Sequence, residues 1–205
     1  MAKLSWRAQM AKTPSTMTDL GTVAPDFKLP DTSGLSWSLK SCAGDAGTLV
    51  MFICNHCPYV LHIKGALSAL ARKYQDLGIG IVAINANDVK KYPDDHPDKM
   101  KLFAQENAFS FPYLFDETQS VAKAYRAACT PDFFLYDRHF KLVYRGQFDD
   151  SRPGNDKPVT GHDLSAACDS LLAGRRISDQ QIPSIGCNIK WKPGNEPDFY
   201  LRPNV

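Results

Sequence analysis

A chain of 205 residues has room for one large domain with decorations, and it can bury enough surface to fold without a covalent staple. Its 24 basic and 22 acidic side chains leave a formal charge of +2, which gives no reason to expect nucleic acid or an anionic membrane as a partner. No segment has the length of apolar sequence that spans a bilayer, and the first residues lack an apolar run of signal-peptide length. We therefore expect a soluble, cytoplasmic protein.

The first half of the chain alternates between strand and helix patterns. Residues 48–53 are apolar, β-branched and aromatic, which predicts a central strand buried on both faces. After Pro58, apolar residues return at three- and four-residue steps and predict a helix that ends near Gly78. Residues 79–84 predict a second buried strand. The polar segment 85–97 reads as a loop.

The second half continues the pattern. A helix is expected around Met100 and Phe103, and a shorter one over residues 119–127. Two strands, at 133–136 and 142–144, are joined by a polar turn and predict a hairpin. A last helix is expected to be capped by Asp163 and to stop at Gly174.

These elements predict an α/β fold with a central mixed sheet flanked by helices. Residues 1–20 are polar and without clear periodicity, so we expect a flexible or loosely docked N-terminal arm. Residues 21–181 form the domain. Residues 182–205 form an irregular tail, which we expect to dock on the domain because Ile189 and Trp191 are too apolar for a solvated arm.

The chemical signal is the motif Cys54-Asn55-His56-Cys57-Pro58, where the predicted strand ends and the helix begins. The unpaired N–H groups and partial positive charge of a helix N-terminus favour a thiolate. Two intervening residues bring both sulfurs within bonding range, and protonated His56 would add positive charge. We interpret the pair as a redox dithiol. Two core cysteines or a zinc knuckle are the weaker interpretations, since no second C-x-x-C exists.

The chain resembles the thioredoxin superfamily over roughly residues 21–175. Residues 21–31, beginning Gly-Thr-Val-Ala-Pro-Asp-Phe, look like the opening of peroxiredoxins and of thioredoxin-like reductases. The C-x-x-C sits at the expected strand–helix junction, and Thr130-Pro131 resembles the cis-proline loop that faces it. The resemblance implies a thioredoxin-like fold and an exposed backbone edge at this loop, on which a substrate peptide pairs.

Residues 149–191 are similar to a little-characterised peroxiredoxin-like family, of the alkyl hydroperoxide reductase/thiol-specific antioxidant type, whose members carry a thioredoxin-type C-x-x-C. Cys57-Pro58 fits the peroxide-attacking frame, with Cys54 in the place of a threonine. The arginine that peroxiredoxins place near the following strand is replaced by Pro131 and Asp132. This departure weakens the peroxidase interpretation, because a peroxide site needs donors and positive charge.

The leading hypothesis is a thiol–disulfide oxidoreductase, with roles in antioxidant activity and cell redox homeostasis. Cys54 would attack, as the more exposed sulfur, and Cys57 would resolve the mixed disulfide. His56 would tune the first pKa, and Pro131 would shape the substrate groove. The alternatives are a thiol peroxidase with Cys57 attacking, and a metal-binding module using Cys54, His56 and Cys57. No cofactor is expected. The partners would be protein or small-molecule disulfides and thiols and an unknown electron donor; the sequence indicates no oligomeric state.

Other residues have alternative interpretations. Cys129 precedes Thr130 and would lie near the active disulfide, although a small buried side chain is the favoured interpretation. Cys187 in the tail could exchange with Cys54 or simply pack. Gly186 would give it an unusual backbone angle and a close approach. Asp94, Asp95 and His96 are interpreted as a solvated acidic turn.

Overall fold

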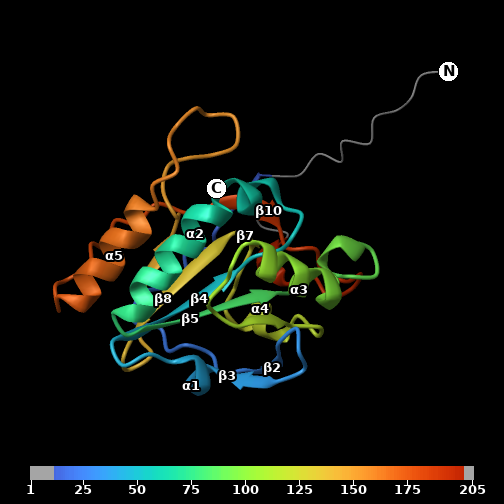
Figure 1. The fold of residues 1–205 in the computed structure, drawn as a ribbon, viewed down its shortest axis with the longest axis horizontal. Helices are drawn as coiled ribbons and strands as arrows, with labels where there is room; N and C mark the ends of the chain where they lie inside the picture. Colours follow the sequence, from blue (N-terminus) through green and yellow to red (C-terminus); the bar gives the residue numbers. More distant parts are fainter. Residues whose placement is uncertain (1–11, 201–205) are drawn as a thin grey trace.

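The computed structural model describes residues 12–200 and has a five-stranded mixed sheet at its centre (Figure 1). The strand order is β6-β5-β4-β8-β9. β4 is parallel to β5, and β5 to β6, whereas β8 is antiparallel to both β4 and β9. The expected thioredoxin-like fold with a central mixed sheet is confirmed. The strands are β4 (Gly47–Phe52), β5 (Ile79–Asn85), β6 (Tyr113–Phe115), β8 (Asp132–Asp137) and β9 (Leu142–Gly146).

Helices cover both faces of this sheet because its central strands are apolar on both sides. Along β4, Leu49 and Met51 pack with α2, α3 and α5, whereas Val50 and Phe52 pack on the other face with α1 and α4. The helices are α1 (Leu39–Cys42), α2 (Pro58–Asp76), α3 (Pro97–Glu106), α4 (Ser120–Ala124) and α5 (His162–Leu172). Among the described residues, no helix combines the length and apolarity needed to cross a membrane.

Two helix boundaries differ from the sequence prediction. The helix expected over 119–127 is shorter, because Gln119 takes a left-handed conformation before α4. The residue before α5 is Gly161, with φ of 65°, so Asp163 lies in the first turn and is not the cap. The remaining short elements are β2 (Lys28–Pro30), which pairs with β3 (Ser36–Ser38), and the 3₁₀ turns η1 (Pro93–Asp95) and η2 (Asp198–Tyr200).

A second, three-stranded sheet joins segments from distant parts of the chain. It consists of β1 (Lys12–Pro14), β10 (Ile185–Asn188) and β7 (Cys129–Thr130), in the order β1-β10-β7. Both pairings are antiparallel. The expectation of a loose N-terminal arm is therefore wrong for residues 12–14, while residues 1–11 lie outside the described part. The tail beyond β10 buries Ile189 and Trp191 against the domain.

A buried carboxyl group links this small sheet to the start of β8. Asp132 is fully buried and accepts hydrogen bonds from Ser15 Oγ at 2.5 Å and from the Ala128 N–H at 3.2 Å. Burial raises the pKa of Asp132 to about 7, although those donors act in the opposite direction. The N-terminal segment is thus attached next to the loop that precedes β8.

This pKa makes the stability of the protein depend on pH. The folded state holds the Asp132 proton more tightly than the unfolded chain does, so this contribution is present at acidic pH and lost as pH rises through about 7. Asp132→Asn removes this titration, although its amide has a single oxygen and can keep only one of the two acceptor contacts. We expect the variant to gain stability relative to the natural chain, by on the order of a few kcal/mol, between about pH 4 and pH 8. Urea unfolding across that range measures it; a constant difference would contradict it.

Candidate active site

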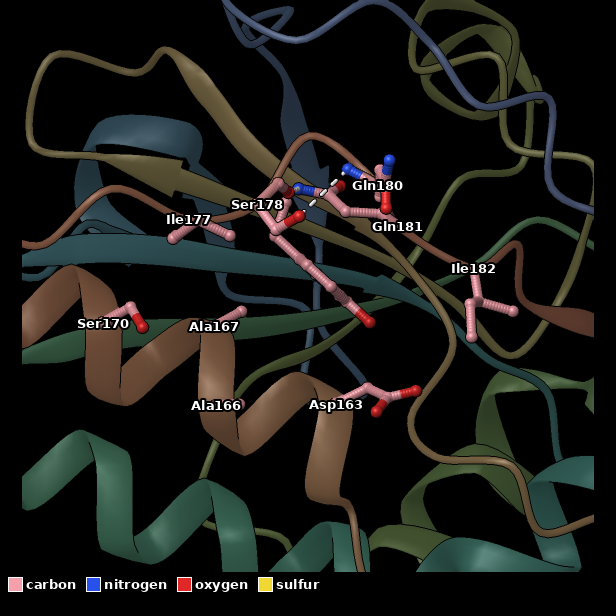
Figure 2. A pocket seen from close by; sticks show the side chains of 10 residues that line it. Asp163, Ala166, Ala167, Ser170, Ile177, Ser178, Gln180, Gln181 and Ile182 are labelled. Carbon is pink, nitrogen blue, oxygen red and sulfur yellow. Dashed lines mark hydrogen bonds between the residues drawn. The ribbon is translucent and has the colours of Figure 1, made fainter.

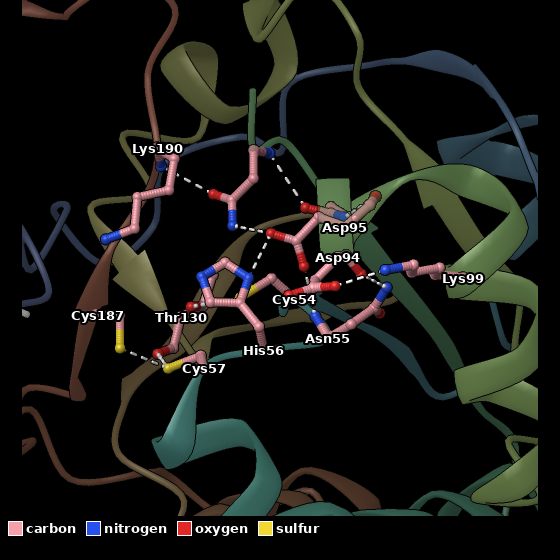
Figure 3. Close-up of polar contacts among 12 residues, drawn as sticks. Cys54, Asn55, His56, Cys57, Asp94, Asp95, Lys99, Thr130, Cys187 and Lys190 are labelled. Atoms are coloured by element: carbon pink, nitrogen blue, oxygen red, sulfur yellow. Dashed lines mark hydrogen bonds and ion pairs between the residues drawn. The ribbon is translucent and has the colours of Figure 1, made fainter. Parts of the chain in front are cut away.

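The two motif cysteines lie where β4 ends and α2 begins, facing the loop that precedes β8 (Figure 3). Cys57 is the residue immediately before α2, and Pro58 opens the helix. The Thr130-Pro131 peptide bond is cis. Cys54 Sγ lies 3.3 Å from Thr130 Oγ1, and Cys57 Sγ lies 3.0 Å from the Thr130 carbonyl oxygen. The structure therefore brings Cys54, Cys57, Thr130 and Pro131 together.

Cys187 is also part of this cluster. Its sulfur lies 2.9 Å from Cys57 Sγ, and β10 places it opposite Thr130 in the small sheet. The sulfur it contacts is that of Cys57, whereas the exchange anticipated from the sequence was with Cys54. A Cβ atom on Gly186 would lie 2.0 Å from the Thr130 carbonyl oxygen, so only glycine permits this approach. The expected unusual backbone angle is wrong: Gly186 is not among the residues with positive φ.

Protonation distinguishes the two motif cysteines, but exposure does not. Cys54 is 1% exposed and Cys57 0%, so exposure does not single out Cys54 as the attacking sulfur. Burial raises the pKa of Cys54 well above its usual value, and the charge of Asp95 raises it further. Burial also opposes ionisation of Cys57, but hydrogen bonds from Cys187, Cys54 and Thr130 outweigh it and lower the pKa of Cys57. Of the two motif cysteines, Cys57 therefore has the lower pKa.

Asp95 organises the polar side of the site, although the sequence suggested a solvated turn. It is fully buried. Its Oδ1 accepts from the Asn55 backbone N–H at 2.8 Å, and its Oδ2 accepts from Asn87 Nδ2 at 2.7 Å. His56 Nδ1 lies 2.8 Å from Oδ2. The interpretation holds for its exposed neighbours Asp94, which pairs with Lys99, and His96. Local sequence gives no sign of this burial, because the contacts of Asp95 come from two other segments.

His56 lies beside the sulfurs, in an environment that favours its protonated form. Contact with Asp95 raises the pKa of His56, against the effect of burial. Its ring stacks on Tyr92 with centroids 5.7 Å apart, and its side chain remains 22% exposed. The pair places one positive and one negative charge next to Cys54. His56 therefore offsets part of the charge by which Asp95 disfavours a Cys54 thiolate.

Asp95 also completes a set of possible metal donors. Cys54 Sγ, His56 Nδ1 and an Asp95 oxygen all lie within 4.8 Å of one another. The sequence had suggested Cys57 as the third donor and had named no carboxylate. In the structure both Asp95 oxygens already accept hydrogen bonds, so a metal ion would have to replace those contacts. The donor set therefore fits a charge-paired redox site better than a metal centre.

The loop edge expected to receive a substrate peptide is already occupied. β10 pairs with β7, so the backbone of Cys129 and Thr130 faces the protein's own tail. What remains open is a small pocket beside the cis-proline, lined by residues that include Tyr59, Pro131, Arg152 and Ile185. A larger pocket between α5 and residues 177–182 shares no lining residue with the cysteine cluster (Figure 2).

Three further cysteines lie apart from the sulfur cluster. Cys129 is fully buried, and its sulfur contacts the Pro131 carbonyl oxygen at 3.5 Å. Burial raises the pKa of Cys129 well above its usual value. Cys168 packs in the core with α5, and Cys42 is buried at the end of α1. Burial raises the pKa of Cys168 to about 12 and that of Cys42 to about 11, so all three favour the neutral thiol.

The Asp95–His56 pair gives a direct test of this electrostatic arrangement. In Asp95→Asn, loss of the carboxylate should lower the pKa of His56 and also that of Cys54. We expect the variant to lose roughly 1–3 kcal/mol of stability, because its amide cannot accept at both oxygen positions. Histidine NMR titration and thiol alkylation against pH measure the shifts. Asp94→Asn is the matched control; equal shifts in both variants would refute the assignment.

Comparison with known proteins agrees with this geometry. Residues 20–145 match the model of the AhpC/TSA family. Thiol-disulfide oxidoreductase ResA from Geobacillus thermodenitrificans is 28% identical over 130 residues, which are 63% of this chain and 70% of that protein. An uncharacterized conserved protein from Geobacillus kaustophilus is 53% identical, with a TM-score of 0.88 over 89% of this chain and 97% of the other.

A more distant structure, peroxidoxin BcpB from Mycobacterium tuberculosis, shares the fold. It is 20% identical, with a TM-score of 0.56, and the alignment covers 76% of this chain and 97% of that one. The family match spans more than half of the sequence and includes β4, the cysteine motif, the cis-proline loop and β8. The chain belongs to the AhpC/TSA family.

Proposed function

We propose that this protein is a thiol–disulfide oxidoreductase that carries two electrons on Cys54 and Cys57. The observation that carries the proposal is the placement of both sulfurs at the N-terminus of α2, against cis-Pro131, with the thiolate favoured at Cys57. Hydrogen bonding to the thiolate and helix-end charge are what activate a cysteine for disulfide exchange. The similarity to proteins named thiol-disulfide oxidoreductase ResA supports this reaction class.

The pKa difference between the two cysteines supports one order of attack. The Cys57 thiolate attacks one sulfur of a substrate disulfide, and the other sulfur leaves as a thiolate that takes up a proton. Cys54 then loses its proton to solvent and attacks Cys57 Sγ, and the second substrate sulfur leaves as a thiolate that takes up a proton. One substrate disulfide becomes two thiols as the Cys54–Cys57 disulfide forms. This order reverses the one inferred from the sequence.

The surroundings of the site bear on its partners. Because β10 occupies the loop edge, an extended peptide cannot pair with β7 there, which favours small disulfides as substrates. A separate thiol donor must reduce the Cys54–Cys57 disulfide again. The cytoplasmic location remains a prediction from the sequence.

A thiol peroxidase with Cys57 attacking is the less favoured function. The Thr130 carbonyl oxygen lies 3.0 Å from Cys57 Sγ, where a peroxide oxygen would need a donor. The guanidinium of Arg152 lines the nearby pocket, but it donates to the carbonyl oxygens of Asp149 and Ser151. β8 itself begins with Asp132, an acidic residue and not a cation.

The main test is disulfide reduction by cysteine variants. Cys57→Ser should reduce turnover of glutathione disulfide by roughly 100-fold or more, because the attacking thiolate is gone. Cys168→Ser, which removes a buried core cysteine, should retain the natural rate. Mass-tag trapping after oxidation should show Cys54 and Cys57 protected together in the natural chain. Full alkylation of both at all glutathione ratios would exclude the redox function.

Peroxide reactivity separates the two candidate functions. We expect the fully reduced protein to react with hydrogen peroxide at a rate within about tenfold of a free thiol at the same thiolate fraction, because an acceptor, the Thr130 carbonyl oxygen, faces Cys57 Sγ and backbone carbonyls engage Arg152. Stopped-flow fluorescence of the reduced protein measures the rate. A rate several orders of magnitude higher would make the peroxidase the better assignment.

A further inference from the structure

Cys57 has two sulfur neighbours, and the proposed reaction uses only one of them. Cys54 is within hydrogen-bond reach on one side. Cys187 Sγ lies 2.9 Å away on the other side, less than an ångström longer than a disulfide bond of about 2.05 Å. Figure 3 shows Cys187 of the tail strand next to Cys57, with the dashed line joining the two sulfurs. Closing a bond to Cys187 would require a small movement of side chains.

We propose that Cys187 is a third redox cysteine, which closes a Cys57–Cys187 disulfide as an alternative to the Cys54–Cys57 disulfide. The inference rests on the proposed oxidoreductase function and adds a second resolving sulfur to it. The tail strand then acts as a built-in exchange partner of the site.

The small sheet holds Cys187 in register for this reaction. Cys187 faces Thr130 across the β10–β7 pairing, and residues that face each other across strands project to the same side of a sheet. Thr130 Oγ1 contacts Cys54 while Cys187 contacts Cys57, so one sheet face presents both groups to the dithiol. β1 pairs with the other edge of β10, with Lys12 opposite Cys187, and fixes the strand from that side.

Gly186 is the second positioning feature. The close approach of its Cα to the Thr130 carbonyl leaves no room for any side chain at this position. β10 also packs against α2, whose first turn follows Cys57. A cysteine that only fills space does not need a second sulfur beside it. Cys168 is such a residue, because it packs among apolar side chains in the core with α5.

Charge favours Cys187 as a nucleophile once Cys57 is oxidised. In the reduced site, the hydrogen bond to Cys57 raises the pKa of Cys187 well above its usual value, and burial and the Cys57 charge raise it further. A mixed disulfide at Cys57 removes both the charge and the need for that hydrogen bond. The nearby Lys190 ammonium, which lowers the pKa of Cys187, then acts with less opposition.

The electron balance needs no additional oxidant. A substrate disulfide and the Cys57 thiolate give a mixed disulfide and one substrate thiol. Cys187 loses its proton to solvent and attacks Cys57 Sγ, so the Cys57–Cys187 bond forms as the bond to the substrate sulfur breaks. The departing substrate thiolate takes up a proton. Cys54 can later attack Cys57 in the same way and displace Cys187, which interconverts the two protein disulfides without net oxidation.

The test removes Cys54 and asks whether Cys187 replaces it. Reduced Cys54→Ser, Cys54→Ser/Cys187→Ser and Cys54→Ser/Cys168→Ser are treated with glutathione disulfide, quenched in acid and mapped by mass spectrometry. We expect Cys54→Ser and its Cys168→Ser control to form the Cys57–Cys187 disulfide and to release glutathione. The variant that lacks both resolving sulfurs should retain one glutathionyl group on Cys57, at least tenfold above the other two.

The outcomes separate the two proposals. If Cys54→Ser retains glutathione on Cys57 as fully as the variant lacking Cys187, the third-cysteine inference is wrong, while a Cys54–Cys57 disulfide in the natural chain still supports the oxidoreductase. If the natural chain forms neither a protein disulfide nor a glutathione adduct at Cys57, the oxidoreductase itself is wrong. Cys187→Ala in place of Cys187→Ser, with circular dichroism of each variant, excludes an effect of misfolding.

Discussion

The need to hold a negatively charged sulfur out of water shapes this site. A buried thiolate is unfavourable unless donors surround it, and Cys57 obtains them from Cys54, Cys187 and Thr130. These residues come from three separate parts of the chain. The strand–helix junction supplies the cysteine pair, the cis-proline loop supplies Thr130, and the tail supplies Cys187. The small sheet pairs β10 of the tail with β7 of the cis-proline loop, and so holds two of these parts beside the cysteine pair.

The Asp95–His56 pair makes the two motif cysteines chemically unequal. A carboxylate close to Cys54 disfavours a second thiolate, so charge remains on Cys57. His56 limits this effect because it carries the opposite charge. The arrangement differs from one in which helix-end charge alone selects the nucleophile. Here burial and the hydrogen bond shared with Cys57 disfavour ionisation of Cys54, and the buried carboxylate of Asp95 adds to that effect.

The sequence was informative wherever a local pattern determines structure. The apolar run at 48–53, the helix from Pro58 and the C-x-x-C between them predicted β4, α2 and the position of the dithiol. Asp95 and the β10–β7 pairing escaped prediction because their partners lie far away in the chain: Asp95 meets Asn55 and His56, and Cys187 meets Thr130. Gly186 was correctly linked to close approach, but the reason is a neighbouring carbonyl and not a rare backbone angle.

The pairing of β10 with β7 also has a consequence for the order in which the protein is made. A ribosome delivers the motif at 54–57 and the loop at 129–131 well before residues 185–188, and domains begin to organise during synthesis. The nascent site therefore lacks its last strand, and Cys57 lacks one of its three donors, for as long as the tail is still being translated. During this interval β1 has already left the ribosome, but β10, the strand with which it pairs, has not yet been made. The thiolate environment of the finished protein is thus acquired only when nearly the whole described chain has been synthesised.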